Sequence, residues 1–113
     1  MTNPTKAQKK YWTAIVELGC IACRHDGVYN PATGVHHLDG RTKTNSHWLV
    51  ISLCKNHHQG VDGFELCVHP NKARFEKKYG EQISLLKETL GILKDLGYDY
   101  RNVEKIADTW RSL

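Results

Sequence analysis

No stretch of the sequence reaches the roughly 18 consecutive apolar residues that a membrane-spanning helix needs. The N-terminus also lacks the apolar core of a secretory signal peptide, because residues 1–6 are mostly polar. Internal repeats, low-complexity tracts and linkers are absent as well, so nothing in the sequence marks a domain boundary. These absences predict a cytoplasmic protein whose residues 1–113 form a single domain.

The composition is ordinary for a globular protein, but its charge is biased. Of the 113 residues, 40% are hydrophobic and 25% are charged. Lys and Arg outnumber Asp and Glu by 16 to 12, which gives a formal net charge of +4. Such an excess is compatible with a polyanionic partner, although solvated helix faces would explain it too. The basic clusters are Lys6, Lys9 and Lys10; Arg41 and Lys43; and Lys72, Arg74, Lys77 and Lys78.

The cysteines occur in a pattern typical of metal ligands. Disulfides are rare in a reducing cytoplasm, so the four cysteines are interpreted first as ligands. Cys20 and Cys23 form a Cys-x-x-Cys motif, and Cys54 and His57 repeat the same spacing. Three thiolates and one imidazole form a closed tetrahedral set that suits structural Zn²⁺. A redox pair at Cys20 and Cys23, or simple burial of the cysteines, are the alternatives.

Hydrophobic periodicity predicts a mixed fold of class α+β. Several segments repeat apolar residues every three or four positions, as amphipathic helices do. Two shorter segments are predicted strands, because one alternates in polarity and the other is apolar and β-branched. A turn-rich segment at residues 24–33 is expected to be a surface loop or a distorted hairpin. The predicted helices cover residues 5–18, 70–79, 83–96 and 103–110, and the predicted strands cover residues 35–38 and 48–53.

The remaining histidines suggest a second site. His36 and His37 are adjacent on a predicted strand, so their side chains point to opposite faces and must have different roles. His58 directly follows the predicted zinc ligand His57 and is therefore held rigidly, as an open metal site requires. A lone histidine is more often a satisfied polar residue than a ligand, but His69 adds a further member to this group.

Two motifs together resemble the HNH endonucleases, also called ββα-metal or His-Me finger nucleases, with an integral zinc knuckle. The motifs are Val35-His36-His37-Leu38-Asp39-Gly40-Arg41 and Leu53-Cys54-x-x-His57-His58. A closer resemblance is to the phage Ref-type RecA-dependent nuclease family, and it is carried by residues 19–23, 47–60, 68–70 and 75–80. It implies a zinc knuckle and ββα core over residues 19–80 and a helical C-terminal extension over residues 81–113.

The resemblance also implies a role for each histidine near the motifs. His37 would be the general base that activates water, and His36 and His58 would bind the catalytic divalent metal ion. The family's third histidine is not found at its usual place one helical turn later, so His69 is the candidate for the third ligand. His47 is the candidate for orienting the base, in place of the middle asparagine of the HNH motif.

The activity implied by the resemblance is metal-dependent cleavage of DNA. We expect an endonuclease or nickase of phage or prophage origin that acts in the cytoplasm of a bacterial host. Its cofactors would be structural Zn²⁺ and a catalytic Mg²⁺ or other divalent ion, and its partners DNA and a RecA-type recombinase filament. The alternative is a zinc-stabilised DNA-binding or recombination-accessory module, which has no need of a base at His37. DNA contacts are expected from Arg41, Lys43, Lys72, Arg74, Lys77 and Lys78.

Overall fold

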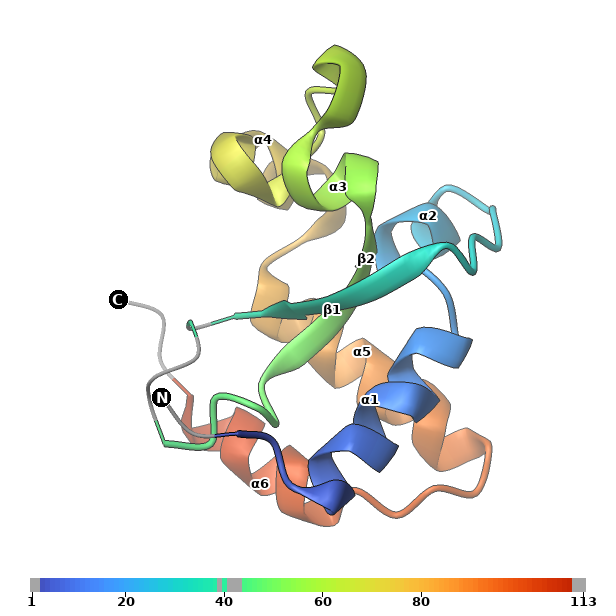
Figure 1. Cartoon of the computed structure of the whole chain (residues 1–113), viewed down its shortest axis with the longest axis vertical. Helices are drawn as coiled ribbons and strands as arrows, with labels where there is room; N and C mark the ends of the chain where they lie inside the picture. The colour runs from blue at the N-terminus through green and yellow to red at the C-terminus, as the bar shows by residue number, and fades with distance from the viewer. Residues whose placement is uncertain (1–2, 39, 41–43, 111–113) are drawn as a thin grey trace.

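The structure, a computed structural model, describes residues 3–38, 40 and 44–110, with the side chain of Asp62 excepted. These residues form α-helices, one 3₁₀ turn and a two-stranded sheet, which is the predicted α+β class (Figure 1). None of the described helices is long and apolar enough to cross a membrane. In chain order the elements are α1 (Lys6–Glu17), α2 (Ile21–His25), β1 (Thr33–His37), β2 (Val50–Cys54), α3 (Lys55–Gln59), η1 (Val61–Gly63), α4 (Val68–Tyr79), α5 (Gln82–Asp95) and α6 (Arg101–Thr109).

Helix α1 begins at a capping box and leads into the first cysteine motif. The Thr5 hydroxyl accepts a hydrogen bond from the backbone N–H of Gln8 at 3.1 Å, and the Gln8 side chain accepts one from the backbone N–H of Thr5 at 2.8 Å. After the helix, Gly19 adopts a φ of 80°. A Cβ atom there would lie 2.8 Å from the carbonyl oxygen of Asn30. Glycine therefore allows the chain to turn closely past Asn30 into Cys20.

The short helix α2 occupies part of the segment that the sequence predicts to be a loop. The Cys20 side chain accepts a hydrogen bond from the backbone N–H of Cys23 at 3.4 Å and so caps this helix. Five residues make little more than one helical turn, which is too short for periodicity to reveal. The rest of the predicted loop, residues 26–32, contains no helix or strand.

Strands β1 and β2 pair in antiparallel fashion and determine which way the adjacent histidines face. Val35 lies opposite Ser52, and His36 lies opposite Ile51. All five residues of β2 are buried, so this strand is the central element of the fold. Helix α3 begins at the residue directly after β2, and the three elements together form a ββα unit.

Strand β2 begins two residues later than the sequence predicts. Trp48 and Leu49 belong instead to the preceding turn, where their N–H groups donate to the carbonyl oxygens of Asn45 and Ser46. Their apolar side chains resemble those of a strand because Leu49 is buried and Trp48 is half-buried. The Leu49 carbonyl oxygen still accepts a hydrogen bond from the Leu38 N–H at 2.9 Å, but Trp48 and Leu49 both lie outside the strand, and burial explains their apolar pattern.

Helix α4 includes the predicted helix start at Pro70 but begins slightly earlier, at Val68. His69 and Asn71 depart from helical backbone angles, so the first turn is irregular. The helix ends before Gly80, whose φ is 99°. The irregular first turn is the part of α4 that carries His69.

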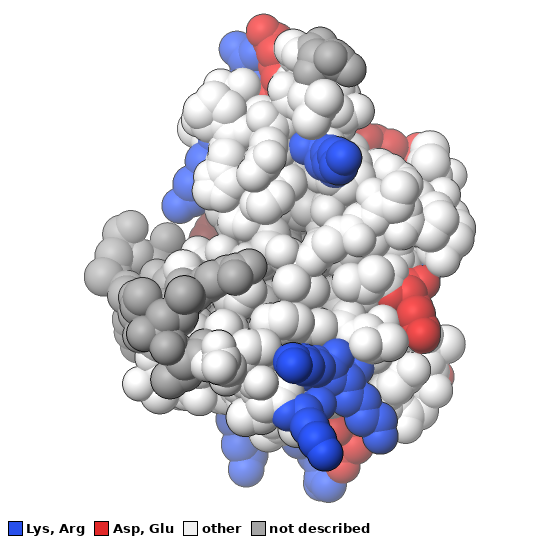
Figure 2. All heavy atoms as spheres, in the orientation of Figure 1, with Lys and Arg blue, Asp and Glu red and all other residues white. Residues whose placement is uncertain are grey.

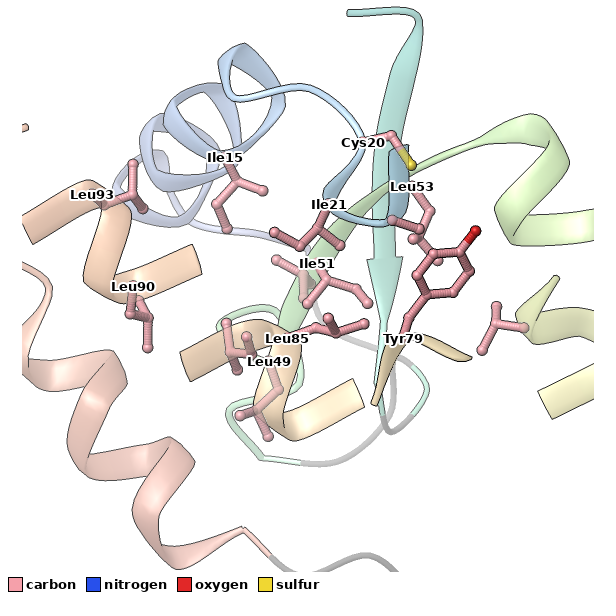
Figure 3. Close-up of a cluster of buried hydrophobic side chains, with 14 of the residues drawn as sticks. Ile15, Cys20, Ile21, Leu49, Ile51, Leu53, Tyr79, Leu85, Leu90 and Leu93 are labelled. Carbon is pink, nitrogen blue, oxygen red and sulfur yellow. The ribbon is translucent and has the colours of Figure 1, made fainter. Parts of the chain in front are cut away.

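The core lies between the ribbon and helices α1 and α5, and it anchors the end of β2 that carries Cys54. In Figure 1, α5 crosses behind the ribbon, α3 and α4 lie at one end of the molecule, and α6 lies at the other. Figure 3 shows the buried side chains that converge from α1, α2, β2 and α5: Ile15, Ile21, Ile51, Leu53, Leu85, Leu90 and Leu93.

Candidate functional site

The first group of functional side chains is a cysteine and histidine cluster that three elements bring together. Cys20 caps α2 and Cys23 lies within it, Cys54 is the last residue of β2, and His57 lies in α3. The sulfur atoms of Cys23 and Cys54 are 3.8 Å apart. Nδ1 of His57 lies 3.5 Å from the sulfur of Cys20, 3.5 Å from that of Cys23 and 3.2 Å from that of Cys54.

These distances fit the ligands of a single tetrahedral ion. Zn–S bonds of about 2.3 Å and Zn–N bonds of about 2.0 Å place tetrahedral sulfur ligands about 3.8 Å apart and a sulfur about 3.5 Å from a nitrogen. Burial raises the pKa of the Cys20 thiol to about 12, so a thiolate here requires a nearby cation. The four side chains could therefore hold a metal ion.

Tyr79 and Asp26 support the imidazole of this cluster from outside. With Nδ1 of His57 facing the sulfur atoms, Nε2 carries the proton and donates it to the Tyr79 hydroxyl at 3.0 Å. The Tyr79 hydroxyl donates in turn to Oδ2 of Asp26 at 2.7 Å, and this bond lowers the pKa of the Asp26 carboxyl. Burial, together with the same bond, raises the pKa of Tyr79 and keeps it a donor. This chain of bonds fixes the orientation of the His57 ring.

A second cluster consists of His36 from β1, His58 from α3 and His69 from α4. Their ligand atoms lie within 4.8 Å of one another, and Nδ1 of His36 lies 3.1 Å from Nε2 of His58. Two adjacent nitrogen ligands at about 2.1 Å from one ion would be about 3.0 to 3.4 Å apart, so the pair fits a shared cation. Nε2 of His36 faces away from the cluster and lies 2.8 Å from Oε1 of Gln82.

His36 and His58 of the second cluster are in the neutral form that binds metals. Burial, more than the neighbouring histidines, lowers the pKa of His36 to about 4. Burial and the nearby His69 also lower the pKa of His58. Both rings are therefore neutral at neutral pH, and each keeps a nitrogen lone pair for a cation.

A cavity of about 600 Å³ lies over the second cluster. It is bordered by the end of β1, the start of α4 and the start of α5, and it is open enough for solvent and a ligand to enter. His37 borders this cavity in addition to the three clustered histidines. The polar and charged residues that line it are His36, His37, His58, His69, Lys72 and Gln82.

His37 has different partners from its neighbour His36, as the strand geometry predicts. Nε2 of His37 and Nδ1 of His47 are 3.0 Å apart. The indole Nε1 of Trp12 donates to the backbone carbonyl oxygen of His47 at 2.7 Å, and the Trp12 ring lies edge-on to both imidazoles. Helix α1 thus contributes Trp12 to the environment of the two histidines.

The predicted basic residues of α4 have unequal surroundings. Arg74 forms an ion pair with Glu65 at 2.7 Å, and Lys78 forms one with Asp26 at 3.3 Å. Lys72 lines the histidine cavity and has an exposed side chain. Since an ion pair already neutralises part of their charge, Arg74 and Lys78 are weaker candidates than Lys72 for binding an anion.

Other predicted basic residues are on a different surface or outside the described part of the chain. Figure 2 shows a concentration of basic side chains over α1, where Lys6, Lys9 and Lys10 are exposed. Arg41 and Lys43, which the sequence analysis names as DNA contacts, lie outside the described residues.

Several residues near the clusters carry no signal in the sequence. Gln82 belongs to no motif, and Tyr79, although it lies in a segment that carries the family resemblance, shows no sign in the sequence of a role at the cluster. Asp26 lies in a turn-rich segment, where acidic residues are common. Cys67, by contrast, is fully buried and belongs to neither cluster, so it is a core residue.

The fold and these contacts define a small α+β protein with one sulfur-rich cluster and one histidine cluster, each of which includes one residue of α3. The model of a protein family described as "Recombination enhancement, RecA-dependent nuclease" matches residues 4–94. The matched region includes every residue of both clusters and most of the chain. The protein belongs to this family of RecA-dependent, recombination-enhancing nucleases.

Proposed function

We propose that this protein is a metal-dependent DNA endonuclease or nickase of the HNH type. The observation that carries the proposal is the cavity that His37 lines together with His36, His58 and His69. Hydrolysis of a phosphodiester needs a proton acceptor and a cation at one place, and this cavity offers residues suited to both tasks. The family's description as nucleases supports the same reaction.

The sulfur-rich cluster would hold structural Zn²⁺. Three thiolates and one imidazole complete a tetrahedral set, which leaves no position for water and suits a stabilising ion. The ion would join α2, β2 and α3 through Cys20, Cys23, Cys54 and His57. Because His58 follows His57 directly, the same ion would also fix the position of His58, a proposed ligand of the second site.

In the proposed mechanism, His37 accepts a proton from the attacking water. His47 would orient the ring of His37 through their contact at 3.0 Å. His36, His58 and His69 would hold the catalytic cation, which when bound offsets the charge that develops on the phosphate and the leaving oxygen. The bound phosphodiester would occupy the cavity between the base and the cation ligands.

The ligand set of the second site favours a transition metal ion over Mg²⁺. The three described ligands are imidazoles, which suit transition metal ions, whereas Mg²⁺ prefers carboxylate, phosphate and water oxygens. We therefore expect Mn²⁺ to support cleavage at lower concentrations than Mg²⁺ does.

DNA is the proposed substrate, and Lys72, Arg74, Lys77 and Lys78 are proposed to contact its phosphates. The family description supports a RecA-type filament as a partner in recombination. We further propose a phage or prophage origin and action in the cytoplasm of a bacterial host, by a single domain formed by residues 1–113.

The decisive experiment is a cleavage assay on plasmid and single-stranded DNA. Each substrate is tested with Mn²⁺, with Mg²⁺ and without added metal, in the presence and absence of a RecA filament. We expect His37→Ala to lower the cleavage rate by about 10² to 10⁴, because it removes the general base. Its zinc content and DNA affinity should be unchanged.

His25→Ala is the matched control, because His25 pairs with Glu88 at 2.7 Å and belongs to neither cluster. This variant should cleave DNA at the rate of the unmodified protein. Cleavage by His37→Ala at the unmodified rate would refute the mechanism. Binding of DNA without cleavage under every condition would instead favour an accessory module.

A further inference from the structure

We infer that Gln82 is a positioning residue that selects the nitrogen of His36 presented to the cation site, and that Glu76 fixes Gln82 in turn. The inference rests on the proposed function, because the cation site is that of the proposed nuclease. Gln82 is the first residue of α5 and is only 7% exposed despite its polar side chain. Its Oε1 lies 2.8 Å from Nε2 of His36, and its Nε2 lies 3.3 Å from Oε2 of Glu76.

The donors and acceptors of these three side chains allow one arrangement. A carboxylate accepts hydrogen bonds and cannot donate them, so Glu76 requires the amide NH₂ group of Gln82 on its side. The amide oxygen then faces His36 and can only accept, so Nε2 of His36 carries the ring proton. The lone pair is left on Nδ1 of His36, which lies 3.1 Å from Nε2 of His58 within the cluster. The correct nitrogen thus faces the cation site.

A purely structural role would not require these polar groups. An apolar side chain at position 82 could fill the same space without the cost of removing an amide from water. The amide instead connects the first residue of α5 to the proposed ligand His36 on β1, which is distant in sequence. Outer partners of metal-bound histidines commonly raise metal affinity by fixing the ring and its proton.

The first test measures Mn²⁺ affinity of the full-length, zinc-loaded protein by electron paramagnetic resonance without DNA. Mn²⁺ is a suitable probe because it competes poorly for thiolate ligands. Gln82→Met keeps the length of the side chain but removes the acceptor, so we expect Mn²⁺ to bind about 10 to 100 times more weakly. Glu76→Gln should cause a smaller loss, because it acts only through Gln82. Unchanged Mn²⁺ affinity in Gln82→Met would overturn the inference.

Thr89→Val is the matched control on the same helix. It removes a buried hydrogen bond from the Thr89 hydroxyl to the Leu85 carbonyl oxygen, and neither residue belongs to the histidine cluster or lines its cavity. We expect a lower Tm and unchanged Mn²⁺ affinity. The combination Gln82→Glu with Glu76→Gln exchanges the amide and the carboxylate but keeps an acceptor facing His36. This exchange should regain most of the affinity that Gln82→Met loses, and no recovery would count against the inference.

A second readout reports the proton of His36 directly. In the absence of Mn²⁺, ¹⁵N chemical shifts should show the Nε2–H form of His36 in the unmodified protein and a mixture of forms in Gln82→Met. A dominant Nδ1–H form in the unmodified protein would overturn the inference even if Gln82→Met failed to fold. If the chemical shifts and Mn²⁺ affinities are as expected but the protein does not cleave DNA, the proposed function is refuted and the role of Gln82 stands. If the unmodified protein cleaves DNA but Gln82→Met binds Mn²⁺ with unchanged affinity, the role of Gln82 is refuted and the proposed function stands.

Discussion

Nε2 of His57 lies 3.0 Å from the Tyr79 hydroxyl, which connects the sulfur-rich cluster to the last residue of α4. His57 and His58 are neighbours in the five-residue helix α3, so a shift of one ring moves the backbone of the other. The integrity of the first cluster and the geometry of the second are therefore coupled through α3.

Tyr79→Phe should weaken metal binding at the sulfur-rich cluster. The substitution removes the acceptor for Nε2–H of His57, and the loss of such an outer partner typically lowers metal affinity by about 10 to 100 times. The measurement is the rate of zinc release to a chromophoric chelator. Tyr29→Phe is the control, since the Tyr29 hydroxyl donates to the backbone carbonyl oxygen of Glu17 at 3.1 Å, and neither residue belongs to a cluster. Equal release rates for both variants would contradict the prediction.

Cys54→Ser should abolish binding of the zinc ion that we propose for the sulfur-rich cluster, and with it the cooperative unfolding transition. Three ligands remain, and a site that loses a thiolate no longer contributes its metal-binding free energy to folding. Cys67→Ser makes the same substitution at a buried cysteine outside the cluster, so it should keep the metal. Elemental analysis and thermal unfolding check both variants. A zinc-loaded, cooperatively folded Cys54→Ser would show that Cys54 is not a required ligand of a structural metal site.

His58→Ala and His37→Ala should lose DNA cleavage in different ways. Loss of a cation ligand weakens metal occupancy, so excess Mn²⁺ should partly restore cleavage by His58→Ala but not by His37→Ala. His69→Ala should behave like His58→Ala, because their rings are 5.1 Å apart and share the cluster. The measurement is the cleavage rate as a function of Mn²⁺ concentration. Normal cleavage by His69→Ala at low Mn²⁺ would remove His69 from the ligand set.

Lys72→Ala with Lys77→Ala should reduce the salt dependence of DNA binding. Each lost phosphate contact lowers the slope of log K against log salt by about 0.9, so a change of about 1 to 2 is expected. The measurement uses the His37→Ala background, in which the DNA stays intact. Replacement of Lys6, Lys9 and Lys10 by Ala is the comparison, since these residues form the basic surface over α1 (Figure 2). If the slope changes only in the variant that lacks Lys6, Lys9 and Lys10, the DNA binds to the surface over α1 instead.

Local sequence patterns predict the parts of the site that depend on short spacing. Two residues separate Cys20 from Cys23, and two separate Cys54 from His57. This repeated spacing predicts a ligand cluster, because a tight turn brings both members of each pair to one ion. The structure brings these side chains together. Strand alternation likewise predicts the different surroundings of His36 and His37.

Contacts between distant segments could not be predicted in the same way. Gln82 meets His36 across 46 residues of sequence, and Tyr79 meets His57 across 22 residues. Neither contact can be predicted from periodicity, because both contacts depend on how α4 and α5 pack against the ββα unit. The predicted loop starts too early by two residues, because Arg24 and His25 belong to α2, where a cysteine side chain caps the helix in place of a usual capping residue.

The pairing of β1 with β2 limits how this sequence can evolve. A shift of β1 by one residue would move His36 to the face of His37 and remove both from their partners. The hydroxyl groups of Thr33 and Ser52, 2.8 Å apart, add a polar contact that favours the observed register. Related chains should therefore differ in length in the connection between the strands, and insertions or deletions inside either strand should be eliminated by selection.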